Sequence, residues 1–149
     1  MLLIVIGAWI MVSGAAWTDA TRGRIPNAWW IAGLVWAGVG GIAQWIPWSH
    51  LWWAGGAWVF YEIRAWRSPA FHPGAVSWGD VKLIVALLAL LGILGVWVVL
   101  WAQIGVYLWA WGRWLGRGRQ GTWKHQSVRW APWAWIALTG WGLFFLIVR

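Results

Sequence analysis

The chain has 149 residues, of which 62% are hydrophobic and only 9% are charged. Soluble domains carry about 25% charged residues, and so few charges cannot cover a surface that faces water. The composition therefore excludes a soluble globule and predicts one all-α, multi-pass membrane domain over residues 1–149. Because the chain has no Cys and its three His do not fall at ligand spacing, we expect no disulfide framework and no metal site.

Six helices are predicted from the apolar runs of the sequence. A hydrocarbon core of about 30 Å needs about 20 residues per helix at 1.5 Å each. The run 75–112 would form a single helix of about 57 Å, too long even for a tilted span, so we expect a break at Leu91 to Gly95. Charge, Pro and Gly place the predicted helices at 1–17, 28–48, 50–63, 75–91, 93–111 and 131–148.

The basic residues fall in alternate connections between these helices. The positive-inside rule then predicts an inner (plasma) membrane protein with cytoplasmic basic loops and both termini outside. Orientation and contact with anionic lipids account for the formal net charge of +8, so no nucleic-acid partner is expected. The 22 Trp are interpreted as interfacial anchors and packing residues. The bases concerned are Arg22, Arg24, Arg64, Arg67, Arg113, Arg117, Arg119, Lys124 and Arg129.

The three acidic residues are functional candidates because an ionisable side chain in a membrane helix is costly. Asp19 is predicted at the cytoplasmic end of the first helix, and Asp80 about one turn inside the same end of the fourth. The two carboxylates should therefore lie at the same depth. Glu62 lies beside Arg64 at the end of the third helix and is interpreted as an interfacial residue.

Two carboxylates brought within a few ångströms favour the sharing of one proton. One can then activate water as a general base while its partner polarises a carbonyl, which is aspartyl-protease chemistry. The fields of the helix ends favour the charged form of Asp80 and disfavour that of Asp19, so we expect Asp80 to be the base. The structural alternative is that Arg22 and Lys82 simply neutralise two interfacial aspartates.

The sequence flanking each aspartate fits a site. Gly79 leaves room for close approach to Asp80, and Lys82 can extend its ammonium to the membrane surface. In Ile25-Pro26-Asn27, the proline favours an extended residue before it and a helix start near Asn27. This turn is expected to hold Asp19 close to the helical bundle.

Together, these residues resemble the type IV prepilin peptidases, membrane aspartyl proteases with a D-x5-I-P-N loop and a G-x-G-D-x-K motif. The first motif corresponds to residues 19–27 and the second to residues 77–82, and Ala131-Pro132 matches a Pro-containing start of the last helix. The resemblance implies removal of short basic leader peptides from prepilin-like or pseudopilin proteins at the cytoplasmic face. It also implies Asp19 and Asp80 as the catalytic pair, with no metal or cofactor for the peptidase step.

The resemblance has departures. Ser77 replaces the first motif glycine, and the cysteine-containing amino-terminal segment of longer family members is not present, which favours a short, minimal peptidase and puts N-methyltransferase activity in doubt.

Three alternatives to an active peptidase remain: an inactive family member, a non-catalytic subunit of a pilus or secretion assembly, and a small ion or proton pathway. No oligomeric state is assigned. We expect the loop 113–129 to lie on lipid headgroups, while the apolar substrate helix docks between membrane helices.

Overall fold

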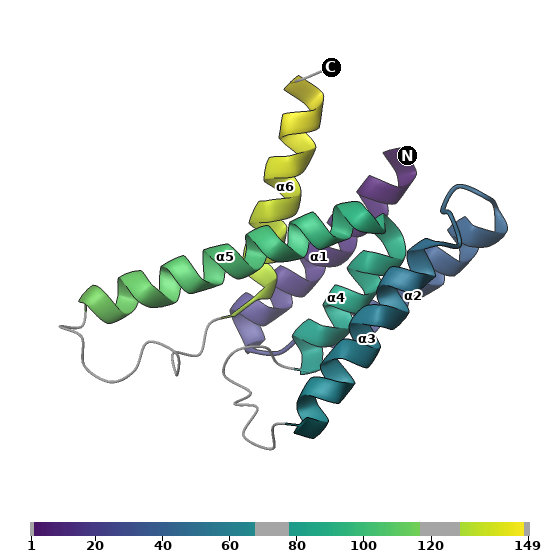
Figure 1. Cartoon of the computed structure of the whole chain (residues 1–149). Coiled ribbons are helices and arrows are strands. Elements are labelled where there is room, and N and C mark those ends of the chain that lie inside the picture. Colours follow the sequence, from purple (N-terminus) through teal and green to yellow (C-terminus); the bar gives the residue numbers. More distant parts are fainter. Residues whose placement is uncertain (1, 68–77, 117–128, 148–149) are drawn as a thin grey trace.

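The computed structural model describes residues 2–67, 78–116 and 129–147, and these ranges form six helices and no strand (Figure 1). The all-helical prediction is therefore confirmed. The motif residue Ser77 and the bases Arg117, Arg119 and Lys124 lie outside the described residues. The helices are α1 (Leu2–Arg22), α2 (Asn27–Ile42), α3 (His50–Arg67), α4 (Trp78–Leu91), α5 (Ile93–Gly116) and α6 (Ala131–Ile147).

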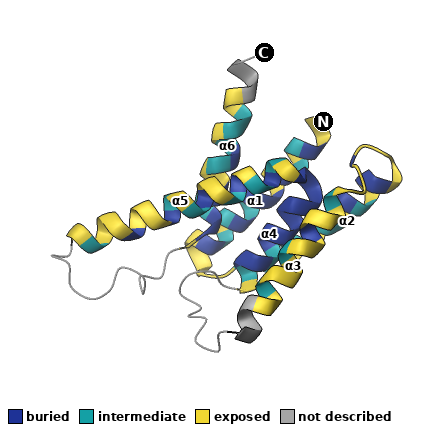
Figure 2. Cartoon of the chain, in the orientation of Figure 1, coloured by how far each residue is buried: buried dark blue, intermediate teal, exposed yellow. Residues whose placement is uncertain are grey.

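Helix α4 forms the centre of the bundle. It packs against α1, α2, α3 and α5, and eleven of its fourteen residues are buried (Figure 2). A helix that is apolar on all sides favours such a position, and between Leu83 and Leu91 the sequence has no polar residue. Helix α6 packs against α1 and α5. Asp80, in the first turn of α4, is itself buried.

The outer surface of the bundle is apolar. Large side chains such as Ile42 and Trp52 are 78% and 83% exposed. Soluble monomers rarely expose large contiguous apolar patches. Two helices, α1 and α5, are long and apolar enough to cross a membrane. These features point to association with a membrane.

Helix α1 continues past its predicted end at Trp17, so Asp19 lies inside the helix and not in a loop. The hydroxyls of Thr18 and Thr21 donate to carbonyl oxygens one turn earlier, at 2.9 and 2.7 Å, which makes both residues compatible with a helix. The helix stops at Gly23, whose φ of 67° is left-handed. The Gly23 amide donates to the Asp19 carbonyl at 2.9 Å, which closes the last turn.

Helix α2 is shorter than predicted. It ends at Ile42, whereas the predicted helix ran to residue 48. The Gly40 carbonyl accepts hydrogen bonds from the amides of Trp45 and Ile46, so the chain turns back on the last helical turn. Conversely, α3 and α5 extend beyond the predicted 63 and 111, because no Pro interrupts either helix before its observed end.

The break between α4 and α5 lies where it was predicted. Gly92 has a left-handed φ of 55°, and its amide donates to the Leu88 carbonyl at 2.8 Å. A Cβ at Gly92 would lie 2.4 Å from Cδ2 of His50, at the start of α3. The Nδ1 atom of His50 also lies 3.0 Å from the Leu90 carbonyl oxygen. The far end of α4 is thus anchored to α3, and His50 lies at the opposite end of α4 from Asp80.

Candidate functional site

Asp19 and Asp80 are both buried, with exposed fractions of 7% and 6%. Asp19 lies near the C-terminal end of α1 and Asp80 near the N-terminal end of α4, and Figure 1 shows both helix ends on the lower side of the molecule. The two helices pack against each other. By contrast, Glu62 is exposed on α3. The structure thus brings the two candidate acids to the same end of the bundle and leaves the third on its surface.

Asp19 is held by the beginning of α6. The backbone amide of Ala131 donates a hydrogen bond to its carboxyl group, and the charge of Arg129 also acts on it. The Arg129 guanidinium donates to the carbonyl of Ala20, the residue that follows Asp19 in α1. The Oδ2 atom of Asp19 has no hydrogen-bond partner within the described ranges.

Asp80 is the third residue of α4 and the acidic residue of its first turn. The first amides of a helix have no acceptor within it, and the N-terminal end of the helix dipole is positive. Both effects stabilise a carboxylate at this position.

The two sequence motifs meet through their polar residues. The Lys82 ammonium donates a hydrogen bond of 3.1 Å to Oδ1 of Asn27, the first residue of α2. The Trp30 indole N–H donates to the same oxygen, also at 3.1 Å, and the Lys82 ammonium lies 5.4 Å from the centre of the Trp30 ring. Asn27 therefore joins two structural elements and does not cap its own helix.

The other motif residues have supporting positions. Ile25 is partly buried and packs against the core. Pro26 directly precedes α2 with φ −61° and ψ 145°, an extended conformation that suits the residue before a helix. Gly79 is half-buried in the first turn of α4.

Sequence reasoning did not identify the contribution of Arg129, Trp130 and Ala131 to this site. Arg129 was interpreted only as a topology signal, and the backbone of Ala131 carries no side-chain signal. Trp130 is 0% exposed, and its Nε1 has no hydrogen-bond partner among the described residues. The usable signal was their position, since they directly precede Pro132 at a predicted helix start.

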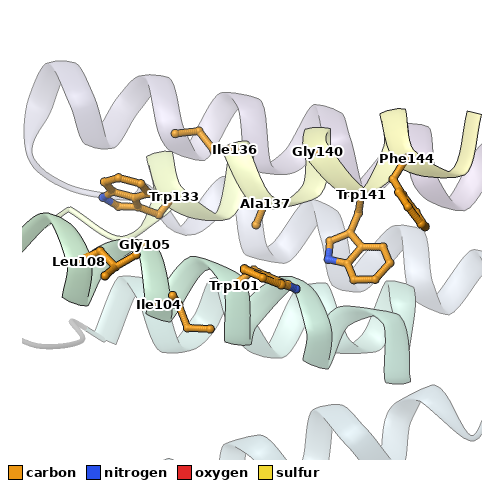
Figure 3. Close-up of a pocket in the computed structure, with 10 residues that line it drawn as sticks. All are labelled: Trp101, Ile104, Gly105, Leu108, Trp133, Ile136, Ala137, Gly140, Trp141 and Phe144. Atoms are coloured by element: carbon orange, nitrogen blue, oxygen red, sulfur yellow. The ribbon is translucent and has the colours of Figure 1, made fainter. Parts of the chain in front are cut away.

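An apolar groove of about 510 Å³ lies between α5 and α6 (Figure 3). Gly105 allows the Trp133 ring to lie against α5, since a Cβ there would be 2.4 Å from that ring. Trp133 lies in the first turn of α6, as does Ala131, so the groove begins close to the Asp19 contact. Its lining comprises Trp101, Ile104, Gly105, Leu108, Trp133, Ile136, Ala137, Gly140, Trp141 and Phe144.

Within the described part of the chain, no group of three or more His, Cys, Asp or Glu side chains is placed to hold a metal ion. No family model matches the chain, and no curated protein or solved structure matches it. Its function must therefore be inferred from its own residues and their contacts.

Proposed function

We propose that the chain is a membrane aspartyl endopeptidase that removes short basic leader peptides from prepilin-like or pseudopilin proteins. The observation that carries the proposal is the contact between Lys82 and Asn27, which joins the two motifs that flank the aspartates. The burial of Asp19 and Asp80 at one end of the bundle supports their role as the catalytic pair.

In this proposal all six helices span the inner membrane, with the aspartates near the cytoplasmic face. The apolar outer surface and the length of α1 and α5 support this arrangement. Arg22, Arg24 and Arg129 lie at the aspartate end of the chain's helices, where they favour cytoplasmic placement and anionic lipid headgroups. The proposed partners are thus the substrate protein and membrane lipid, with no nucleic acid.

In this mechanism each of the two carboxyl groups carries out a different proton transfer of peptide hydrolysis. Asp80 takes a proton from water, and the water oxygen forms a bond to the carbonyl carbon of the scissile peptide. Asp19 gives its proton to the carbonyl oxygen, so a neutral tetrahedral intermediate forms. The C–N bond then breaks as the amine nitrogen takes a proton from Asp80. Asp19 takes a proton back from a hydroxyl group of the tetrahedral intermediate, so the product carbonyl forms and both carboxyl groups return to their starting states. Oδ2 of Asp19, which no described residue contacts through a hydrogen bond, is the oxygen proposed to carry that proton.

The groove between α5 and α6 is the proposed docking surface for the apolar helix of the substrate. Its lining carries no charged side chain, which suits an apolar segment. At the Trp133 end it reaches the turn of α6 that holds Asp19. A segment lying in the groove would therefore lead to the catalytic pair.

Co-expression with a prepilin-like substrate tests the proposal, with leader removal measured by the mass of the product. We expect cleavage by the parent and by Glu62→Gln, a control acid exposed on α3, and losses of at least about 100-fold for Asp19→Asn and Asp80→Asn. Membrane insertion of every variant is measured in parallel. If the aspartate variants cleave as well as the parent, the catalytic pair is wrong. If the parent cleaves none of several substrates, the proposal fails in favour of a non-catalytic subunit or an ion pathway.

A further inference from the structure

The end of α1 and the beginning of α6 are joined by two contacts. The Ala131 amide donates to the Asp19 carboxyl, and Arg129 donates to the Ala20 carbonyl, 109 residues away in the chain. Each contact uses a backbone group at a helix end, where no partner exists within the helix. Each helix end therefore supplies a hydrogen-bond partner for an unpaired backbone group of the other, and both contacts lie next to Asp19.

The first turn of α6 fixes the position of the Ala131 amide. The Trp130 carbonyl accepts hydrogen bonds from the amides of Trp133 and Ala134, at 3.0 and 3.1 Å. Trp130 and Ala131 are both 0% exposed, so the surrounding core holds this turn in place. A backbone amide held in this way has far less freedom than a side-chain donor.

Arg129 completes the arrangement from the other side. Its guanidinium lies at the C-terminal end of α1, where a positive charge is favoured. The guanidinium lies close to this helix end, since a Cβ at Gly23 would be at van der Waals distance, 3.7 Å, from Nη2 of Arg129. The contact holds the start of α6 against the helix that carries Asp19.

We propose that the Ala131 amide and Arg129 are positioning groups for Asp19: the amide orients the carboxyl group, and the guanidinium keeps the amide in place. This inference rests on the proposed peptidase function. The orientation directs the hydrogen bond to one side of the carboxyl group and leaves Oδ2 to exchange a proton with the substrate. Ala131 and Arg129 thus contribute to the reaction through Asp19, without contacting the scissile peptide.

Ala131→Pro is the direct test because proline has no amide hydrogen to donate to Asp19. Proline is well tolerated at the first position of a helix, which Ala131 occupies. Pro132→Ala is the matched control, since it alters the neighbouring residue and retains the Ala131 amide. Purified protein in lipid nanodiscs is assayed for leader cleavage as a function of pH, with kcat and KM determined separately.

We expect Ala131→Pro to lower kcat about 10-fold with little change in KM, and Pro132→Ala to match the parent. The Ala131 hydrogen bond stabilises the ionised form of Asp19, so its loss moves the limb of the pH profile that reports Asp19 to higher pH. The other charged groups near this end, Arg22, Arg24, Asp80 and Lys82, stay unchanged in this comparison. An unaltered kcat and pH profile would overturn the inference.

Ala131 is fully buried, so a second variant guards against misfolding. Arg129 is exposed, and Arg129→Gln is expected to lower kcat about threefold and to move the same limb, with partial recovery in Arg129→Lys. A variant series in which Gln, Lys and Arg at position 129 give equal kcat and equal profiles contradicts the role of the guanidinium.

A labelling experiment separates failure of this inference from failure of the proposed function. A lipophilic carbodiimide reacts with protonated carboxyl groups and adds to them covalently, and peptide mass spectrometry locates the adduct on Asp19. We expect the pH of half-maximal labelling to be higher in Ala131→Pro than in the parent, whether or not the protein cleaves leaders. If labelling is identical in the two proteins, the positioning contact is excluded even when cleavage is observed.

Discussion

Lys82 and Asn27 are 55 residues apart in the chain, yet the Lys82 ammonium and the Asn27 side-chain oxygen are joined by a hydrogen bond of 3.1 Å. Trp30 supports the pair by donating its indole N–H to the same oxygen. Asp80 lies two residues before Lys82, and Asp19 lies on the helix that precedes α2. The contact therefore restrains the relative placement of the segments that carry the two carboxyl groups.

A double-mutant cycle measures this restraint. We expect Asn27→Ala and Lys82→Met each to lower the free energy of unfolding, and the double variant to lose about 1 kcal/mol less than the sum, because either change alone removes the same charge-assisted bond. Denaturant unfolding in detergent micelles gives the three values. Trp30→Phe, which retains a ring and loses the N–H donor, serves as the milder control. If the loss in the double variant equals the sum of the losses in the two single variants, the contact contributes no coupling free energy.

Gly23→Ala tests the left-handed end of α1. We expect a loss of about 1 kcal/mol, because an L residue is strained at a φ of 67°, while the 3.7 Å approach of Arg129 adds no clash. Gly23→Asn should lose less, since Asn tolerates this conformation. Gly38→Ala in α2 is the control: nothing lies within 4 Å of its Cβ, and alanine favours the helix. Thermal unfolding of the three variants would contradict the prediction if Gly38→Ala were the most damaging.

Gly92→Ala is predicted to be more harmful, with a loss of about 2 kcal/mol or more, because strain at a φ of 55° adds to a 2.4 Å approach to His50. Adding His50→Ala removes the clash and leaves the backbone strain. The double variant should therefore recover part of the loss, although His50→Ala alone loses the contact with Leu90. No recovery in unfolding measurements would assign the whole effect to the backbone.

Filling the groove tests its proposed occupant. Gly140 and Gly142 both have nothing within 4 Å of the Cβ position, but only Gly140 lines the groove (Figure 3). We expect Gly140→Leu to raise KM for an intact prepilin-like substrate by about fivefold or more, because the added side chain fills the groove and the substrate helix can bury less apolar surface there, and Gly142→Leu to leave it unchanged. Kinetics in nanodiscs give both values. Equal KM values for the two variants would assign the groove to lipid or to a second copy of the chain.

The helices could be predicted from the sequence because apolar runs and the Gly92 break mark them directly. Their ends were less predictable, because a charge or a proline shows where a helix can stop and not where it does. Thr18 and Asp19 are polar, yet α1 runs through both, since a threonine hydroxyl bonds back to its own helix and burial accommodates the carboxyl group. Where a glycine takes a left-handed φ, as at Gly23, the end is sharp.

The aspartates and the flanking motifs were predictable because buried charge is rare and costly in an apolar chain. The contact between Lys82 and Asn27 was not, since it depends on how α2 and α4 pack. The contact between the Ala131 amide and Asp19 could not be predicted from the sequence. Every residue except proline offers an amide, so only the fold shows which amide reaches Asp19.

The early end of α4 has a consequence for membrane thickness. From Asp80 to the turn at Gly92 the helix rises only about 18 Å, well short of a hydrocarbon core of about 30 Å. Because α4 lies at the centre of the bundle, the lipid around the whole bundle must thin, if the helices span the bilayer as proposed, before water can reach Asp80 from the cytoplasmic side. Cleavage should therefore be faster in vesicles of short-chain lipids than in long-chain ones, and equal rates across chain lengths would argue against such thinning. The activity of the protein would then follow the composition of the membrane as well as the supply of substrate.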